Sequence, residues 1–290
     1  MEGCLYLIKQ YVPGLSPSER KVAEYLINHP VEAVGFNITK LAQKANTSTA
    51  AIIRFANRIG YKGYSDLRLH LAKEVFSTEK PHEDRLLIEL DESTTTDDIV
   101  KTMVGITHES IEGLAKVIDR TALEAAVETI ATARHIVICG VGASGIVGTD
   151  LQQKLARLGL LAIYTPDSDM QIVQACALKE NDALVAISYS GETNKVLRVV
   201  QEAKNNLTPT IAITRIGGNT LTKRSDINLF VPNIESLFRQ GATISRINQL
   251  MVVDIVYAMI LSRFKGNTNA ILKRTWEAVS HVGETSANAD

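Results

Sequence analysis

The spacing of apolar residues changes along the chain. From Ser16 to Phe76 apolar residues recur every three or four positions, the period of an amphipathic helix, with turn signals at Asn28-His29-Pro30, Asn46 and Gly60. Residues 77–98 are polar and rich in Ser and Thr, which is typical of a linker. This pattern predicts an all-α amino-terminal domain over residues 1–77, a linker over 78–98 and a second domain over 99–290.

In the second domain the helical period gives way to short apolar runs. Two helices are predicted over residues 97–119 and 121–134, and five runs that alternate with helical stretches then follow. This alternation is the signature of βαβ units, so we expect an α/β domain with a five-stranded parallel sheet in the flavodoxin-like order 2-1-3-4-5. The predicted strands cover residues 135–139, 160–164, 183–188, 210–214 and 227–231.

After Pro232 the pattern is helical again, and residues 240–264 form the longest predicted helix. Its apolar run from Leu250 to Leu261 is interrupted by Asp254 and is shorter than the roughly 20 residues that a membrane span needs. We interpret it as a buried helix in the core or at a subunit interface, and we expect no membrane partner. Asp254 should be paired, because an isolated buried charge is costly.

The composition is that of an ordinary globular protein, with 45% hydrophobic and 22% charged residues. The first residues lack the basic region and apolar segment of an export signal, so we expect a cytoplasmic protein. Cys4, Cys139 and Cys176 have no metal or redox spacing, and a packing role is expected for them. We expect neither a metal nor a cofactor.

The segment from Ile38 to Gly60 has the spacing of a helix-turn-helix. Ala42 is small where two helices would cross, Asn46 can adopt the left-handed turn conformation, and Ser48 can cap the second helix, whose Ile52 and Phe55 face the first. The predicted outer face of the second helix carries Ser48, Thr49, Ala50, Ile53, Arg54 and Asn57.

Short side chains at the start of this helix allow close approach to a DNA major groove, where Arg54 can reach a guanine edge or a phosphate. Lys62 and Tyr64 are expected to hold the DNA backbone. Charge agrees weakly with this, because residues 1–80 carry 11 Lys and Arg against 7 Asp and Glu, whereas the remainder carries 20 against 25. A plain helical bundle with a capping Ser48 is the alternative.

Two loops that follow predicted strands carry hydroxyl groups. One is Gly142-Ala143-Ser144, and the other is Ser188-Tyr189-Ser190-Gly191-Glu192-Thr193. If the first and third strands are neighbours, both loops converge on one crevice, where hydroxyls and helix amides can hold a phosphate monoester. We therefore predict ligand contacts from Gly142, Ala143, Ser144, Ser188, Tyr189, Ser190, Gly191 and Thr193. A strand-to-helix turn capped by one Ser is the alternative.

The first loop also satisfies a dinucleotide pattern. Gly140, Gly142 and Gly145 match G-x-G-x-x-G after a strand, and Asp167 stands 25 residues beyond Gly142 as the nearest acid that such a site would need. This alternative stays open, although it does not explain the hydroxyls of the second loop.

The motifs GVGASG and SYSGET together resemble the SIS (sugar isomerase) domain, a phosphosugar-binding α/β fold. The order of helix-turn-helix, linker and SIS domain resembles the RpiR/MurR-like family of bacterial transcriptional regulators. The resemblance implies that Ser144, Ser188, Ser190 and Thr193 hold a phosphate and that Glu235 meets sugar hydroxyls. Two positions depart from the family: Asn46 replaces a common turn glycine, and Gly191-Glu192-Thr193 is closer to the loop of the enzymes.

An enzyme of this class needs a base and usually an acid to open the sugar ring. Glu235 can serve as the base, but no histidine is well placed for the acid, so binding without turnover is favoured. We expect a non-enzymatic regulator that represses sugar or amino-sugar catabolism and binds an inverted repeat of operator DNA as a homodimer or tetramer. A phosphosugar isomerase or lyase with a helical extension is the alternative. Arg239 and Arg246 are either ligand contacts or partners of carboxylates.

Overall fold

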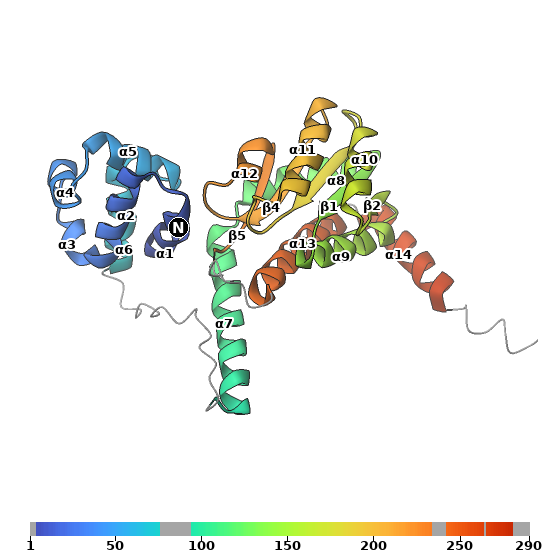
Figure 1. Ribbon diagram of the computed structural model, residues 1–290. Helices are drawn as coiled ribbons and strands as arrows, with labels where there is room; N and C mark the ends of the chain where they lie inside the picture. The colour runs from blue at the N-terminus through green and yellow to red at the C-terminus, as the bar shows by residue number, and fades with distance from the viewer. Residues whose placement is uncertain (1–3, 76–93, 234–241, 264, 281–290) are drawn as a thin grey trace, which may run out of the picture. The chain divides into compact units, whose positions relative to one another are not determined.

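The computed structural model describes residues 4–75, 94–233, 242–263 and 265–280 (Figure 1). The chain divides into two compact units. The first consists of residues 1–118 with the short pieces 215–219 and 232–245, and the second consists of residues 119–214, 220–231 and 246–290. The predicted domain boundaries at residues 77 and 98 stay a prediction.

The amino-terminal region is helical, as the period of its apolar residues predicts. Its elements are α1 (Cys4–Tyr11), the short 3-10 helix η1 (Val12–Gly14), α2 (Pro17–Asn28), α3 (Pro30–Val34), α4 (Ile38–Lys44), α5 (Thr49–Arg58) and α6 (Tyr64–Val75). The helices begin at strong signals, because Ser16 and Glu19 form a capping box at α2, and Asn37 and Ser48 cap α4 and α5.

One core joins these helices. Its fully buried members include Ile8, Leu26, Leu41, Phe55 and Leu67, from five of the helices. Burial of side chains of this size contributes roughly 1.5–3 kcal/mol each. A continuous core of this kind fixes the position of α4 and α5, the two helices of the predicted helix-turn-helix.

The rest of the chain follows the predicted alternation closely. The helices are α7 (Thr96–Val117), α8 (Arg120–Thr132), α9 (Ala143–Arg157), α10 (Ser168–Cys176), α11 (Asn194–Asn205), α12 (Thr220–Arg224), α13 (Thr243–Arg263) and α14 (Lys265–Ser280). The strands are β1 (Ile136–Gly140), β2 (Ala162–Tyr164), β3 (Ala183–Ile187), β4 (Thr210–Arg215) and β5 (Ile227–Val231).

The strands form one five-stranded sheet in the order β2-β1-β3-β4-β5, which confirms the flavodoxin-like order. Parallel pairing joins β1 to β2, β1 to β3 and β3 to β4. In the register of the central pair, Ile136 lies opposite Ala183 and Gly140 lies opposite Ile187. The carboxyl ends of β1 and β3 are therefore adjacent at the same edge of the sheet.

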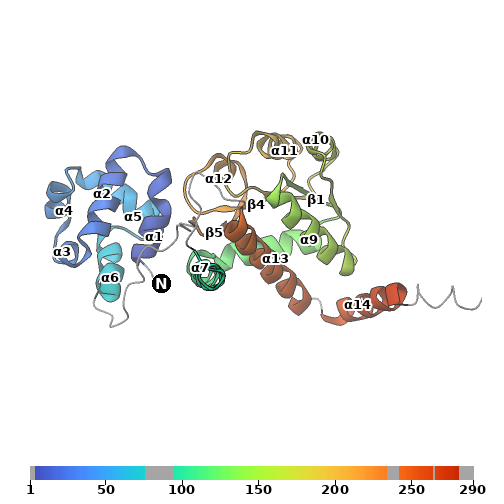
Figure 2. The ribbon, with the colours of Figure 1, turned by 60° about the horizontal axis from the view of Figure 1, so that its bottom comes forward.

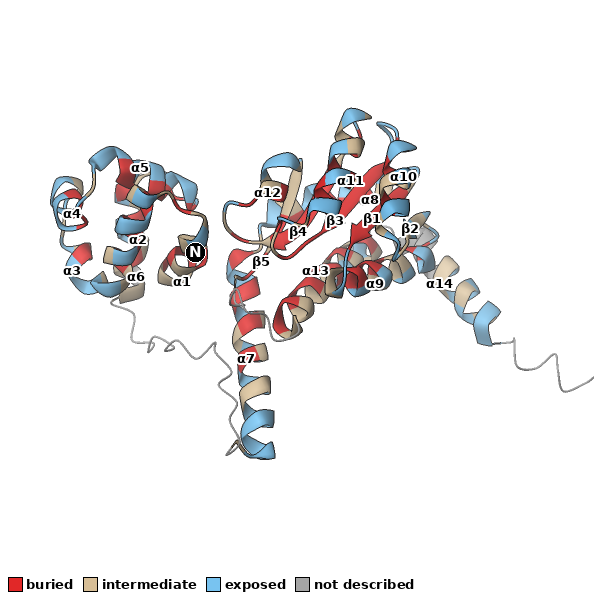
Figure 3. Ribbon diagram, viewed as in Figure 1, coloured by how far each residue is buried: buried red, intermediate tan, exposed pale blue. Residues whose placement is uncertain are grey.

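Helices cover both faces of the sheet (Figures 1 and 2). Val137 and Leu184 pack on one face in a cluster with residues of α10 and α11. On the other face Val185 and Ile211 meet Ile130 of α8 and Val253 of α13. Strands buried on both faces read as continuous apolar runs, and all residues of β1 and β3 are buried (Figure 3).

Helix α13 is long and apolar enough to cross a membrane by length and composition, and in the described part of the chain no other helix is. In the fold, 44% of its most apolar window is buried. Asp254 is paired as expected, with Lys154 Nζ at 2.7 Å, but the expectation that it is buried is wrong, since its side chain is 52% exposed. Lys154 also contacts Asp150 one turn back on α9.

The cysteines follow the expected packing role only in part. Cys4 and Cys139 are buried, and burial raises the pKa of each thiol to about 12. Both thiols are therefore protonated and unreactive at neutral pH. Cys176 is exposed at the end of α10, so the packing role predicted for it is wrong.

Candidate functional site

The helix-turn-helix is built as its sequence predicts. Asn46 has φ +48°, the left-handed conformation that the turn between α4 and α5 requires. The Ser48 hydroxyl accepts a hydrogen bond from the Ala51 amide at 3.2 Å and so caps α5. Ile52 and Phe55 are fully buried and Ala42 is nearly so, which fixes α5 against α4.

The opposite face of α5 is exposed. The residues that the sequence places there, namely Ser48, Thr49, Ala50, Ile53, Arg54 and Asn57, are all exposed. Among the described residues Arg54 has no ion-pair partner, whereas Arg58 in the same helix binds Glu19 at 3.2 Å. Arg54 is therefore available to a ligand, and Arg58 is engaged in holding α5 to α2.

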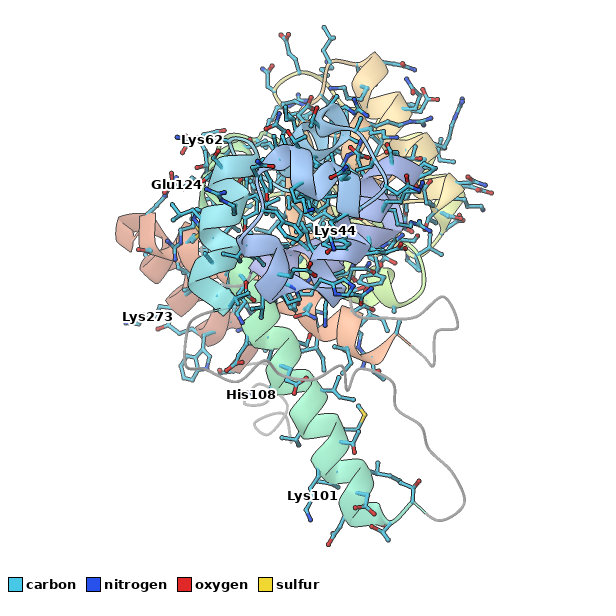
Figure 4. The ribbon with its side chains drawn as sticks, turned by 90° about the vertical axis from the view of Figure 1, so that its left-hand side faces the viewer. Lys44, Lys62, Lys101, His108, Glu124 and Lys273 are labelled. Carbon is cyan, nitrogen blue, oxygen red and sulfur yellow. The ribbon has the colours of Figure 1, made fainter. Side chains whose placement is uncertain are left out.

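The two residues beyond α5 differ from each other. Lys62 is exposed and lies on the surface of the amino-terminal domain, as Lys44 does (Figure 4). Tyr64 is only 8% exposed, and its hydroxyl donates to the Phe36 carbonyl at 2.9 Å. The prediction that Tyr64 holds DNA is not supported by this position, because its ring packs in the core and its hydroxyl already has an acceptor.

The second candidate site lies where β1 and β3 end. Because Gly140 pairs with Ile187, the two hydroxylated loops leave the sheet side by side. Helices α9 and α11 begin directly after these loops, and neither N-terminus has a side-chain cap. Elsewhere in this unit the side chains of Asp119 and Asp167 cap α8 and α10 by accepting hydrogen bonds from backbone amides of the first turn. The uncapped amides of α9 and α11 are the groups that an anion binds at a helix N-terminus.

The hydroxyls of the second loop are bonded to the loop itself. Ser188 Oγ lies 3.0 Å from Thr193 Oγ1 and accepts from the Gly191 amide at 3.2 Å. Ser190 Oγ accepts from the Glu192 amide at 3.2 Å. Ser188 is buried, whereas Ser190 and Thr193 are partly exposed. Ser190 and Thr193 are thus the hydroxyls that a ligand reaches first, and Ser188 shapes the turn beneath them.

Backbone conformation explains two of the loop glycines. Gly191 has φ +69° and Gly142 has φ +61°, and non-glycine residues rarely adopt such values. Tyr189, by contrast, is buried at 4% exposure, and its carbonyl accepts from Thr214 Oγ1 at 3.3 Å. A ligand contact from Tyr189 would therefore have to come from its backbone.

The dinucleotide alternative finds no support in the first loop. A Cβ on Gly145 would meet Tyr164 Oη at 2.2 Å, so packing against β2 already accounts for the third glycine. The acid that would bind a ribose, Asp167, accepts hydrogen bonds from the amides of Asp169 and Met170. It is therefore the N-cap of α10.

Two buried glutamines, to which the sequence analysis assigned no role, hold the first loop. Gln171 accepts from the Gly140 amide at 3.2 Å and donates to the carbonyls of Gly140 and Thr165. Gln249 accepts from Ser144 Oγ at 3.4 Å. Burial of an amide side chain in an apolar domain is the signal that identifies both, and it appears only in three dimensions.

Several residues considered for catalysis or ligand contact lie outside the described part of the chain. Glu235 and Arg239 lie outside the described residues, and so do His82 and His281. His135 lies at the amino end of β1, with Nδ1 3.4 Å from Asp182, at the opposite edge of the sheet from the two loops. Among the described side chains, no group of three metal-ligating residues is found.

Family models match both parts of the chain. The model described as "Helix-turn-helix domain, rpiR family" matches residues 2–78, and the SIS domain model matches residues 129–259. An uncharacterized HTH-type transcriptional regulator of Caldanaerobacter subterraneus subsp. tengcongensis is 32% identical over 97% of this chain and 98% of its own length. The chain belongs to the rpiR family of helix-turn-helix transcriptional regulators. The predicted family and two-part fold are confirmed.

Solved structures agree with this assignment. The Vibrio vulnificus NanR protein complexed with ManNAc-6P has a TM-score of 0.61 and 29% identity, and the match covers 95% of this chain and 97% of NanR. A putative sugar-phosphate isomerase of Listeria monocytogenes has a TM-score of 0.55 and 24% identity over 63% of this chain and 96% of its own. At that identity the second match shows the shared SIS fold alone.

Proposed function

We propose that this rpiR-family regulator binds operator DNA through α4 and α5 and changes its DNA affinity when a phosphosugar binds the loops after β1 and β3. The observation that carries the effector half is the register of the central strands. Gly140 lies opposite Ile187, so two uncapped helix N-termini and the hydroxyls of Ser144, Ser190 and Thr193 start from adjacent positions. Neutral donors and helix dipoles in this arrangement suit a dianionic phosphate ester.

For the DNA half, the exposed face of α5 would enter the major groove. Its short residues Thr49 and Ala50 allow close approach, and Arg54 would contact a guanine edge or a phosphate. Lys62 would hold the backbone. A homodimer or tetramer would place two such helices about one DNA turn apart and so match an inverted repeat.

The phosphate-anchoring loops recognise the group that all phosphosugars share. The similarity to NanR, whose structure contains ManNAc-6P, supports an amino-sugar phosphate as the first candidate. In this proposal the protein is a cytoplasmic repressor of sugar or amino-sugar catabolism. Effector binding then changes the affinity for operator DNA by the same factor by which operator binding changes the affinity for the effector, since coupling between two binding sites is reciprocal.

The positions of Glu192 and His135 support binding without turnover. Glu192 belongs to the Gly191-Glu192-Thr193 segment that is closer to the loop of the enzymes, and it accepts a hydrogen bond from the Thr220 amide at 2.8 Å. That contact holds the carboxylate against the start of α12. His135 lies at the opposite edge of the sheet, where it cannot reach a sugar held by these loops.

A combined binding and product assay tests the proposal. Purified protein is mixed with a panel of phosphosugars that includes ManNAc-6P, and melting temperature, operator affinity and sugar composition are measured. We expect one phosphosugar to raise the melting temperature and to change operator affinity while it is recovered unchanged. Conversion of the sugar would favour the isomerase or lyase. Failure of every phosphosugar to bind would refute the effector site but leave DNA binding intact.

A further inference from the structure

The interior of the second unit holds a glutamine whose amide is only half bonded. Gln249 of α13 is 1% exposed, and its Oε1 accepts the Ser144 hydroxyl at 3.4 Å. Its Nε2 has no hydrogen-bond partner among the described residues although the atom is buried. A buried donor without an acceptor costs free energy, so an unsatisfied atom of this kind in a native protein needs an explanation.

The contact with Ser144 places this amide next to the loop after β1. Ser144 belongs to the first turn of α9, one of the two uncapped helices at the carboxyl edge of the sheet. Exchange of the amide oxygen and nitrogen would not remove the anomaly, because one end would still bond Ser144 and the other would still lack a partner. The unsatisfied atom thus lies one hydrogen bond away from a hydroxyl predicted to hold phosphate.

A second glutamine provides an internal comparison. Gln171 is equally buried at 1% exposure, yet its amide makes three hydrogen bonds, accepting from the Gly140 amide and donating to the Gly140 and Thr165 carbonyls. These bonds fasten the end of β1, so the role of Gln171 is structural. The fold therefore satisfies one buried glutamine of this region completely and leaves the other with a free donor.

We propose that Gln249 is a further effector-binding residue, which donates its amide N–H to an oxygen of the phosphosugar beside Ser144. This inference rests on the proposed function of the two loops. An incoming oxyanion beside Ser144 accepts a hydrogen bond from Gln249 Nε2. A third element, α13, then joins the loops after β1 and β3 in the site, and the ligand satisfies the buried donor.

The substitution Gln249→Met tests this role, because it keeps the length of the side chain and removes the amide. In the full-length protein we expect the unliganded melting temperature to stay the same or rise, since an unsatisfied donor is lost. The affinity for ManNAc-6P and for inorganic phosphate should fall about 10- to 100-fold, the loss of one hydrogen bond to a charged group. Gln171→Met is the matched control, and it should lower the unliganded melting temperature.

A second variant keeps the test decisive if Gln249→Met does not fold. Gln249→Glu still accepts the Ser144 hydroxyl, but it presents a negative charge to the phosphate, so affinity should fall further than in Gln249→Met. If wild-type protein binds either probe and both variants bind it equally well, Gln249 is not a ligand residue, while the proposed effector site stands. If wild-type protein binds neither probe nor any other phosphosugar of the panel, the effector site and this inference both fail.

Discussion

The outer face of α5 and the loop after β3 differ in how their polar side chains are bonded. On α5, Arg54 and Asn57 are exposed, and in the described chain Arg54 has no ion-pair partner. In the second loop, Ser188 and Thr193 bond each other, and Ser190 bonds a backbone amide. The proposed DNA-binding face is therefore exposed without internal hydrogen bonds of Arg54 in the described chain, whereas the hydroxyls of the proposed effector loop already take part in hydrogen bonds within the loop.

This difference predicts that the affinities for DNA and for a phosphosugar are determined by different interactions. DNA meets side chains that need no rearrangement, so its affinity should depend on charge and fall steeply with salt. A phosphosugar must replace internal hydrogen bonds of the loop, so its net affinity is a difference between bonds formed and bonds broken. Rearrangement of the loop upon binding is also what would allow the ligand to favour one conformation of the protein over another.

The largest effect is expected from removing the two accessible hydroxyls of the second loop. Ser190→Ala with Thr193→Val should lower phosphosugar affinity by at least about 100-fold, since two hydrogen bonds to a charged group are lost. Calorimetric titration with ManNAc-6P measures this loss, and a gel shift measures operator binding without effector, which should persist. The control Thr129→Val with Thr132→Val removes hydroxyls that bond only carbonyls of α8. An equal loss of DNA binding in the loop variant would contradict separate sites.

The next effect separates the stability of the sheet from ligand affinity. Asp182 is buried between the amino ends of β1 and β3 and accepts from Arg134 and from the Lys179 amide. Burial opposes its ionisation, but these hydrogen bonds and the charge of Arg134 outweigh it and lower the pKa of Asp182. Asp182→Asn should lower the free energy of unfolding by about 2–4 kcal/mol at pH 7 and leave phosphosugar affinity nearly unchanged.

The pH dependence of the same variant has a definite sign. Because the pKa of Asp182 is lowered in the folded protein, its stabilising contribution is complete above the unfolded pKa of about 3.9 and is lost as the pH falls through the folded pKa. Denaturant unfolding at pH 7 and below pH 4 should show the difference between wild type and Asp182→Asn shrinking with acid. A difference that stays constant would show that the charge of Asp182 does not matter.

A smaller effect is expected on the recognition helix. Arg54→Ala should weaken operator binding about 5- to 100-fold with no change in melting temperature, because the guanidinium has no partner in the described fold. Arg54→Lys should recover part of the affinity if the contact is to phosphate, and little if it is a bidentate contact to guanine. Arg58→Ala, in the same helix, should instead lower the melting temperature by releasing Glu19, which is buried. Competition gel shifts and thermal melts distinguish the two outcomes.

The smallest effect concerns Lys62. Lys62→Ala should reduce operator affinity only a few-fold, equally for all sequences, and lower the slope of log affinity against log salt by about 1. The control Lys273→Ala in α14 should leave the slope unchanged. A loss that depends on the DNA sequence would mean that Lys62 reads bases.

Much of the fold could be predicted because its signals are local. The strands are buried on both faces, so they appear as apolar runs, and the helix-turn-helix appears through a cap at Ser48 and a left-handed turn at Asn46. The errors arose where burial depends on distant residues. Tyr64 was expected to contact the DNA backbone and Asp254 to be buried, whereas the structure buries Tyr64 and exposes Asp254. The partner of Tyr64 is Phe36 and that of Asp254 is Lys154. Both partners are distant in the sequence, so the pattern of neighbouring residues does not reveal them.

For the candidate effector site too, some features could be predicted from the sequence and others could not. The hydroxyl-rich loops were visible in the sequence, because each follows a strand and precedes a helix. The contacts of the glutamines were not, because Gln171 and Gln249 reach the first loop from helices 31 and 105 positions away from the residues they bond. A Gln in a helical pattern gives no sign of which loop it will touch.

By itself, the sequence determined the order of elements, the two-part organisation and the residue types at the two candidate sites, since period, capping and turn chemistry act over a few neighbouring positions. Only the tertiary structure decided that the loops after β1 and β3 start from paired residues, that Ser188 is buried while Ser190 and Thr193 are partly exposed, and that an unsatisfied amide of α13 lies beside Ser144. Hydrogen bonds and burial between distant segments exist only after the chain has packed.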